Sequence, residues 1–173
     1  MAASGTALVT LAAVIVGASL SGRTQRNHWV RETRLKACSE FLRSYSRVFI
    51  DVGQFCRNGA GVSTDTWADW EQVLAGLTLV SSPQVVSAAL KVDEAVWRAH
   101  TAVKTGRSGE DDWLSLRQPI EAARVAFVNA ARRQLIPGDS PHLTEVQGRP
   151  ADDDPMWIPV QEARKQRAQS GPH

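Results

Sequence analysis

The stretch ALVTLAAVIVGASL, residues 7–20, is almost continuously apolar, and residues 1–22 contain no charged side chain. A hydrocarbon layer about 30 Å thick needs roughly 20 helical residues, because a helix rises about 1.5 Å per residue. Inside that layer a single segment can satisfy its own backbone hydrogen bonds only as a helix. The sequence therefore predicts a transmembrane anchor over residues 1–22.

Basic residues begin directly after this stretch. They are Arg23, Arg26, Arg31, Arg34 and Lys36, whereas no Lys or Arg precedes the apolar run. An excess of Lys and Arg marks the cytoplasmic side of a membrane span. We therefore expect a single-pass protein of the cell membrane, with its N-terminus outside and its C-terminal domain in the cytoplasm.

Two other interpretations of residues 1–22 stay open. A cleaved signal peptide would make this an exported helical protein, but such signals carry their basic residues before the apolar stretch, and here those residues follow it. A soluble protein could instead bury the apolar stretch as its first helix. Of the three interpretations, an uncleaved anchor fits the order of charges best.

The residues next to the anchor are expected at the membrane interface. Trp is favoured at the headgroup level, and basic side chains gain energy beside an anionic leaflet; the interface residues are Arg23, Arg26, His28, Trp29 and Arg31. A place in the helical core would suit Trp29 equally well. Small residues four apart let two membrane helices approach closely, and the anchor has Ala13, Gly17 and Ser21 at that spacing. A contact between two spans is an option, although a lone span is favoured.

Composition limits the soluble part to one domain, residues 23–137, in a chain of 173 residues. A net charge of +2 with 22% charged residues does not favour a nucleic-acid partner. Cys38 and Cys56 lie 18 positions apart on one predicted helix, hence about 27 Å apart and beyond disulfide reach. We expect both to be buried free thiols in a reducing cytoplasm.

Hydrophobic spacing predicts an antiparallel bundle of about four helices, so the fold class is all-α. The first helix covers residues 26–57 and carries a coiled-coil-like seam of apolar residues three and four apart, namely Leu35, Cys38, Leu42, Tyr45, Phe49, Val52 and Cys56. The NGAG sequence at 58–61 ends it. A second helix covers residues 65–77, and residues 78–80 form an extended link.

The last two helices have stronger boundary signals. Ser82 and Pro83 open a third helix over residues 83–104. SGED at 108–111 resembles a capping box for a fourth helix over residues 109–135, in which Pro119 predicts a kink or a break near Arg117. Residues 138–173 are polar and rich in Pro, which predicts a disordered tail. Its MWI patch at 156–158, beside the acids at 152–154, is a docking peptide or folds back onto the bundle; we favour the second.

No pattern in the chain carries a catalytic, cofactor-binding or metal-binding signature, so we predict no cofactor and no enzyme activity. There is no Glu-x-x-His pair, phosphate loop or nucleophile elbow. His100 is expected at the surface or its boundary, and Asp111 and Asp112 suit a helix start. Glu94 with Arg98, and Glu121 with Arg124, are typical of solvated helix faces. Core packing is the default role of the four tryptophans in the predicted helices, Trp67, Trp70, Trp97 and Trp113.

The layout resembles the small uncharacterised single-pass membrane proteins of the streptomycete/actinobacterial type. The resemblance rests on SGRTQR at 21–26, HWVR at 28–31, LVSSPQV at 79–85 and FVNAAR at 127–132, and it covers residues 7–135. It implies a short helical cytoplasmic domain on an anchor and no established activity. The long Pro-rich tail departs from the pattern.

These observations predict a membrane-anchored cytoplasmic helical protein with an interaction or scaffolding role. Its expected partners are the lipid bilayer and a protein partner or a second copy of the chain, with no nucleic acid and no small-molecule substrate. One alternative is a membrane-tethered ligand-sensing or regulatory domain, in which tryptophans would line an apolar pocket between helices. The other alternative is the exported helical protein with a cleaved signal peptide.

Overall fold

The computed structural model describes residues 4–136, 138 and 142–144, and for residues 4–24 it describes the backbone alone. Within these residues it contains helices and no β-strand. The helices are α1 (Ser4–Asn58), α2 (Thr64–Val80), α3 (Pro83–Lys104) and α4 (Glu110–Leu135). The predicted all-α fold with four helices is therefore confirmed. The predicted tail lies outside the described residues except for 138 and 142–144.

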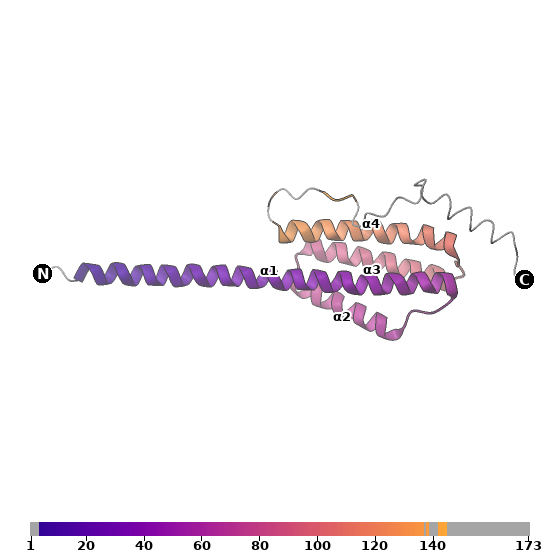
Figure 1. The fold of residues 1–173 in the computed structure, drawn as a ribbon, viewed down its shortest axis with the longest axis horizontal. Helices are drawn as coiled ribbons and strands as arrows, with labels where there is room; N and C mark the ends of the chain where they lie inside the picture. The colour runs from indigo at the N-terminus through magenta and orange to yellow at the C-terminus, as the bar shows by residue number, and fades with distance from the viewer. Residues whose placement is uncertain (1–3, 137, 139–141, 145–173) are drawn as a thin grey trace, which may run out of the picture. The chain divides into compact units, whose positions relative to one another are not determined.

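The helices run alternately up and down. Arg34 of α1 donates to the Val80 carbonyl at the end of α2, and the Ser82 amide that precedes α3 donates to Gln134 near the end of α4. At the other end, the Gly109 amide before α4 donates to the Cys56 carbonyl near the end of α1. We call the end with Arg34 and Gln134 the proximal end of the bundle, and the end with Cys56 and Gly109 the distal end. The N-terminal half of α1 extends past the other three helices at the proximal end (Figure 1).

The core is built around the C-terminal half of α1. Phe41 is fully buried, and its ring lies 4.4 Å from that of Phe127 on α4 and 5.0 Å from that of Trp70 on α2. Fully buried valines from α3 complete the interior. Three helices therefore meet one face of α1, and that face is wider than the two-position seam of a coiled coil.

This wider face corrects the predicted seam. Cys38, Tyr45, Val52 and Cys56 are buried as expected, but Phe41 and Val48 are buried as well. Leu35, the first predicted seam position, is 54% exposed. The prediction was wrong there because Arg31 and Arg34 form the side of α1 that meets α2 and α4 at this level, and Leu35 lies on a side that the other helices leave uncovered.

The second helix is longer than predicted. It continues to Val80, so the expected extended link at residues 78–80 is helical. The Thr78 hydroxyl donates to the Leu74 carbonyl, and Arg34 satisfies the Val80 carbonyl at 2.9 Å. A helix end needs partners for its last carbonyls. Here one of them comes from a different helix, which local sequence patterns cannot indicate.

Two predictions about α4 are also corrected. No side chain caps its start, and Gly109 occupies the N-cap with φ 112°, a conformation that favours glycine. The predicted capping box fails because the N-cap position is taken by Gly109, which has no side chain, and Ser108 lies one residue before it. The Gly109 amide donates to the Cys56 carbonyl at 2.8 Å. The helix also passes through Pro119 without the predicted break. Leu116 and Ile120, buried on either side of the proline, hold the chain in the bundle at that point.

Among the residues whose side chains are described, no helix is both long enough and apolar enough to span a membrane. The side chains of residues 7–20, the apolar run of the predicted anchor, lie outside that described part. The same holds for Ala13, Gly17 and Ser21, the predicted contact between two spans. The anchor and its self-contact accordingly stay predictions.

Candidate functional site

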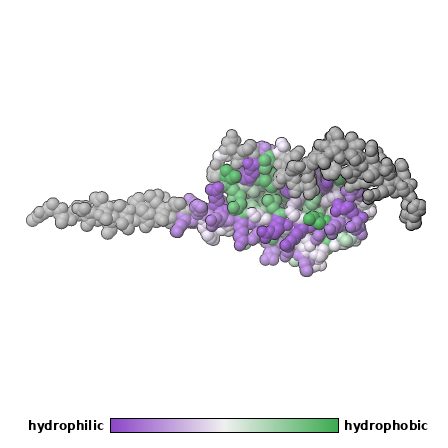
Figure 2. All heavy atoms as spheres, viewed as in Figure 1, coloured by the Kyte–Doolittle hydropathy of each residue, from purple (hydrophilic) through white to green (hydrophobic). Residues whose placement is uncertain are grey.

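The proximal end collects most of the residues predicted at the membrane interface. Arg26, His28, Trp29 and Arg31 are exposed on α1, whereas the Arg23 side chain lies outside the described residues. Trp29 is 66% exposed, which excludes the alternative that it packs in the core of the bundle. Figure 2 shows hydrophilic side chains where the described part of α1 leaves the bundle. The structure thus places these residues together on one exposed turn-and-a-half of helix.

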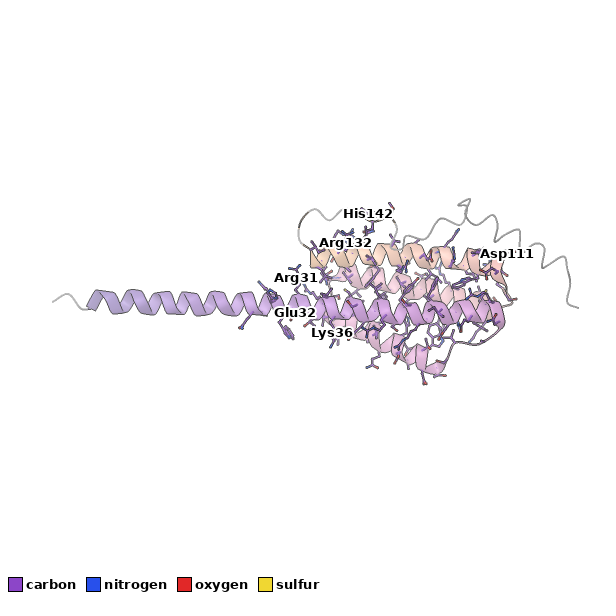
Figure 3. All side chains as sticks on the ribbon, in the orientation of Figure 1. Arg31, Glu32, Lys36, Asp111, Arg132 and His142 are labelled. Carbon is purple, nitrogen blue, oxygen red and sulfur yellow. The ribbon has the colours of Figure 1, made fainter. Side chains whose placement is uncertain are left out.

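The last turn of α4 joins them there. Arg31 and Arg34 line a shallow groove of about 170 Å³ together with Gln134 and Leu135 of α4. Arg132 and Arg133 lie in that same last turn. Figure 3 shows Arg31 on α1 and Arg132 on α4 at the proximal end, with Asp111 at the distal end. The sequence carries no sign that these two arginines approach α1, because nothing local indicates which part of α1 the end of α4 will meet.

Side-chain hydrogen bonds fix this end of the bundle. The Arg34 guanidinium bridges α1 to the end of α2 at 2.9 Å, and the Gln134 amide oxygen accepts the Ser82 amide at 2.6 Å. The first bond links α1 to α2, and the second links α4 to the residue that precedes α3. A surface built on this end has a defined geometry, since hydrogen bonds to the backbone hold its elements in register.

A second notable cluster is aromatic and surrounds His100. The His100 ring lies 5.1 Å from Trp67 of α2, 5.4 Å from Phe55 of α1 and 5.7 Å from Trp97 of α3. Trp67 and Trp97 themselves meet edge to face at 5.3 Å. His100 is only 4% exposed, so its predicted surface position was wrong. The spacing of three between Trp97 and His100 was the available signal, because residues three apart share a helix face.

The chemistry of this cluster is that of a neutral imidazole. Burial lowers the pKa of His100, and the positive charge of Lys104 lowers it further. Its Nδ1 atom is buried without a hydrogen-bond partner in the described part of the chain. Trp97 is 56% exposed despite its contacts, so the core role predicted for it is only partly correct, whereas Trp70 and Trp113 are buried as expected.

The other predicted charged faces have mixed outcomes. Glu94 and Arg98 form the expected exposed pair one turn apart on α3. Arg124 is buried instead, with its guanidinium 5.4 Å from the centre of the Tyr45 ring, a cation–π distance. Its predicted solvated position was wrong because α1 presents an aromatic ring to that face of α4.

Two further grooves lie between helices. One of about 360 Å³ runs between α3 and α4 over Ala95, Ala99 and Ala123. The other, of about 540 Å³, lies between α1 and α2 beside Lys36, Gly76 and Leu79. Neither these two grooves nor the proximal one is lined by a tryptophan. They therefore give no support to the tryptophan-lined ligand pocket of the sensing alternative.

The two cysteines are buried, and the acids are spread over the surface of the described helices. Cys38 and Cys56 are free and buried, as predicted. Burial raises the pKa of both thiols, which suppresses the reactive thiolate. Among the described side chains, no group of three His, Cys, Asp or Glu residues could hold a metal ion.

The end of α4 is followed by a segment that returns to it. The Asn129 side-chain amide donates to the Leu143 carbonyl at 2.8 Å and accepts from the Leu143 amide at 2.9 Å. One side chain therefore satisfies both backbone groups of that residue. The chain is held on α4 at Leu143, inside the span of residues predicted as a disordered tail.

Comparisons of this chain with known proteins found no match. No family model matches the chain, and neither a curated protein nor a solved structure matches it.

Proposed function

We propose that this protein is a membrane-anchored helical bundle that acts in the cytoplasm as an interaction or scaffolding module. The observation that carries the proposal is the continuity of α1. One helix includes both the apolar run at residues 7–20 and the half that forms the centre of the bundle. In this arrangement no loop separates the anchor from the bundle.

Exposed apolar side chains on α3 support an interaction role. Leu90 and Trp97 of α3 are 50% and 56% exposed and lie seven residues apart, hence on one outward side of the helix. Exposed apolar side chains that share a face are typical of surfaces that meet other proteins.

Protease protection tests the proposal directly. The full chain, with a peptide tag after His173, is followed in closed cytoplasmic-membrane vesicles of both orientations. We expect the protein in the membrane fraction after alkaline washing, with the tag digested only when the cytoplasmic face is accessible. If the tagged chain were instead found shortened in the fraction outside the cytoplasmic membrane, when the cells are fractionated before the vesicles are made, the signal-peptide alternative would be established. Release of the chain from the membrane fraction at alkaline pH would overturn the proposal of a membrane anchor.

A further inference from the structure

Two parts of the chain that are far apart in sequence form one basic surface at the proximal end. We call it the basic end, and it consists of Arg26, Arg31, Arg34 and Lys36 of α1 with Arg132 and Arg133 of α4. The proximal groove places the two elements in contact, because residues from both line it. The basic end is therefore a folded surface and more than a run of charges along one helix.

Two acids of α1 lie beside these charges. The Glu32 carboxylate lies 4.0 Å from His28, and the Glu40 carboxylate lies 3.9 Å from Lys36, so the Lys36 charge is partly balanced. Residues 122–135 of α4 contain no acid. At the distal end, by contrast, the first turn of α4 carries Glu110, Asp111 and Asp112. The positive charge is thus concentrated at the one end of the bundle that faces the predicted anchor.

Exposed apolar side chains gather at the same end. Trp29 is 66% exposed, and Leu79, next to the Val80 carbonyl bound by Arg34, is 86% exposed. Ile136, directly after the groove residue Leu135, is 48% exposed. Basic side chains mixed with exposed Trp and aliphatic residues are typical of surfaces that lie against a lipid headgroup layer.

The length of α1 sets the distance to such a layer. Arg31 follows Gly22 by nine helical residues, which is about 14 Å along the axis. The headgroup layer accounts for about 5–7 Å of that distance. The rest is close to one Debye length, about 8 Å at physiological ionic strength. A tilt of about 20°, usual for membrane helices, would bring one side of the bundle closer still.

We propose that the basic end binds the anionic headgroups of the adjoining leaflet and holds the bundle tilted, with the last turn of α4 toward the lipid. The inference rests on the anchor of the proposed function and extends it. Anionic phospholipid is the partner that fits, because the surface combines positive charge with exposed apolar groups beside the membrane. The anchor would fix where the bundle is, and the lipid charge would fix how it is oriented.

The test places a fluorescent probe at either end of the bundle. The full chain carries Ile136→Cys at the proximal end or Asp111→Cys at the distal end, each labelled with an environment-sensitive dye, while Cys38 and Cys56 are buried from the reagent. The protein is reconstituted in nanodiscs of phosphatidylcholine alone or with phosphatidylglycerol. Lipids with a headgroup quencher report how close each probe comes to the surface.

We expect quenching at position 136 to increase in the phosphatidylglycerol discs and at high salt to return to the phosphatidylcholine level. Quenching at position 111 should stay low throughout. Each basic residue near an anionic leaflet contributes about fivefold to association. Arg31→Gln with Arg133→Gln should therefore shift the docked population by up to about 25-fold. Both side chains are exposed, so the fold should be kept, as thermal unfolding can verify.

The matched control removes two exposed charges elsewhere. Arg98→Gln with Lys104→Gln lowers the net charge equally, on α3 away from the proximal end, and should leave the quenching unchanged. Equal quenching in both lipids, in a chain that still needs detergent for extraction, would overturn the lipid inference and leave the anchor standing. A chain that does not enter the discs at all would overturn both. Quenching lost in both double variants alike would assign the effect to net charge and also overturn the inference.

Discussion

A neutral imidazole is held among three aromatic rings at His100, and at the scale of single residues it makes stability depend on pH. Burial lowers the pKa of His100 in the folded chain below its usual value of 6.5, so the unfolded chain binds the proton more readily. Its contribution to stability is therefore complete above about pH 6.5 and decreases as the pH falls below that value.

The measurement is the free energy of unfolding by urea at about pH 7.5 and about pH 5.5. We expect the wild type to lose stability at the lower pH and His100→Phe, which keeps a ring beside Trp67 and Trp97, to lose less. The other three histidines, His28, His142 and His173, are present in both proteins and cancel in the comparison. An equal loss in both proteins would show that the pH dependence does not come from His100.

Two glycines inside helices give a second prediction at this scale. A Cβ at Gly53 would lie 2.9 Å from the Trp113 ring, whereas a Cβ at Gly76 would meet no atom within 4 Å. Gly76→Ala should stabilise by about 0.5–1 kcal/mol, because alanine favours the helix. Gly53→Ala gains the same propensity but displaces a buried ring, for which overpacking costs about 1–3 kcal/mol.

Urea unfolding followed by circular dichroism checks the pair of glycine variants. The two substitutions should have opposite signs, with Gly53→Ala destabilising. If Gly53→Ala were as stabilising as Gly76→Ala, Trp113 would have room to move, and the tight packing of α4 on α1 would be refuted.

At the scale of the helices, the buried face of α1 can be tested by two alanine substitutions. Phe41 is fully buried between Trp70 and Phe127, so Phe41→Ala should cost about 3–5 kcal/mol. Leu35 was predicted in the seam but is 54% exposed, so Leu35→Ala should change stability by less than about 1 kcal/mol. A larger cost at Leu35 than at Phe41 would restore the predicted seam. The midpoint of thermal or urea unfolding decides between them.

The helices themselves could be predicted because their boundary signals are local. Pro83 begins α3, and α1 ends at Asn58 beside Gly59, whose φ of 71° favours glycine. The failures have one physical cause, which is a partner that is distant in sequence. Arg34 binds the Val80 carbonyl at the end of α2, the Cys56 carbonyl binds the Gly109 amide at the start of α4, and neither partner is visible from the neighbouring residues.

The same reasoning applies to the candidate site. Exposure of Arg26, His28 and Arg31 could be predicted, because their polar character is enough to place them outside a core. The approach of Arg132 and Arg133 could not, since it depends on the antiparallel return of α4. The burial of His100 was missed for a similar reason, as its aromatic neighbours come from three different helices.

At the scale of the whole molecule, the proposal separates an anchoring part from a folding part. Among the residues whose side chains are described, the buried apolar core lies between Cys38 and Ala131, and Arg34 bonds α2 just before it. We therefore expect the bundle not to depend on residues 2–22. Deleting residues 2–22 should therefore leave the unfolding midpoint within about 2–4 °C of that of the full chain. The shortened protein should also be released from the membrane fraction into the soluble fraction, because it has lost the apolar run at 7–20.

The full chain and the deleted chain would be compared by cell fractionation and by thermal unfolding of the purified proteins. Release with an unchanged midpoint assigns residues 2–22 to the membrane and residues from Cys38 onward to the fold. A shortened chain that aggregates or unfolds would favour the interpretation of residues 7–20 as a buried helix of a soluble protein. A folded but still membrane-bound product would move the anchoring role to the exposed proximal end, where Arg31→Gln with Arg133→Gln in the shortened chain should then release it.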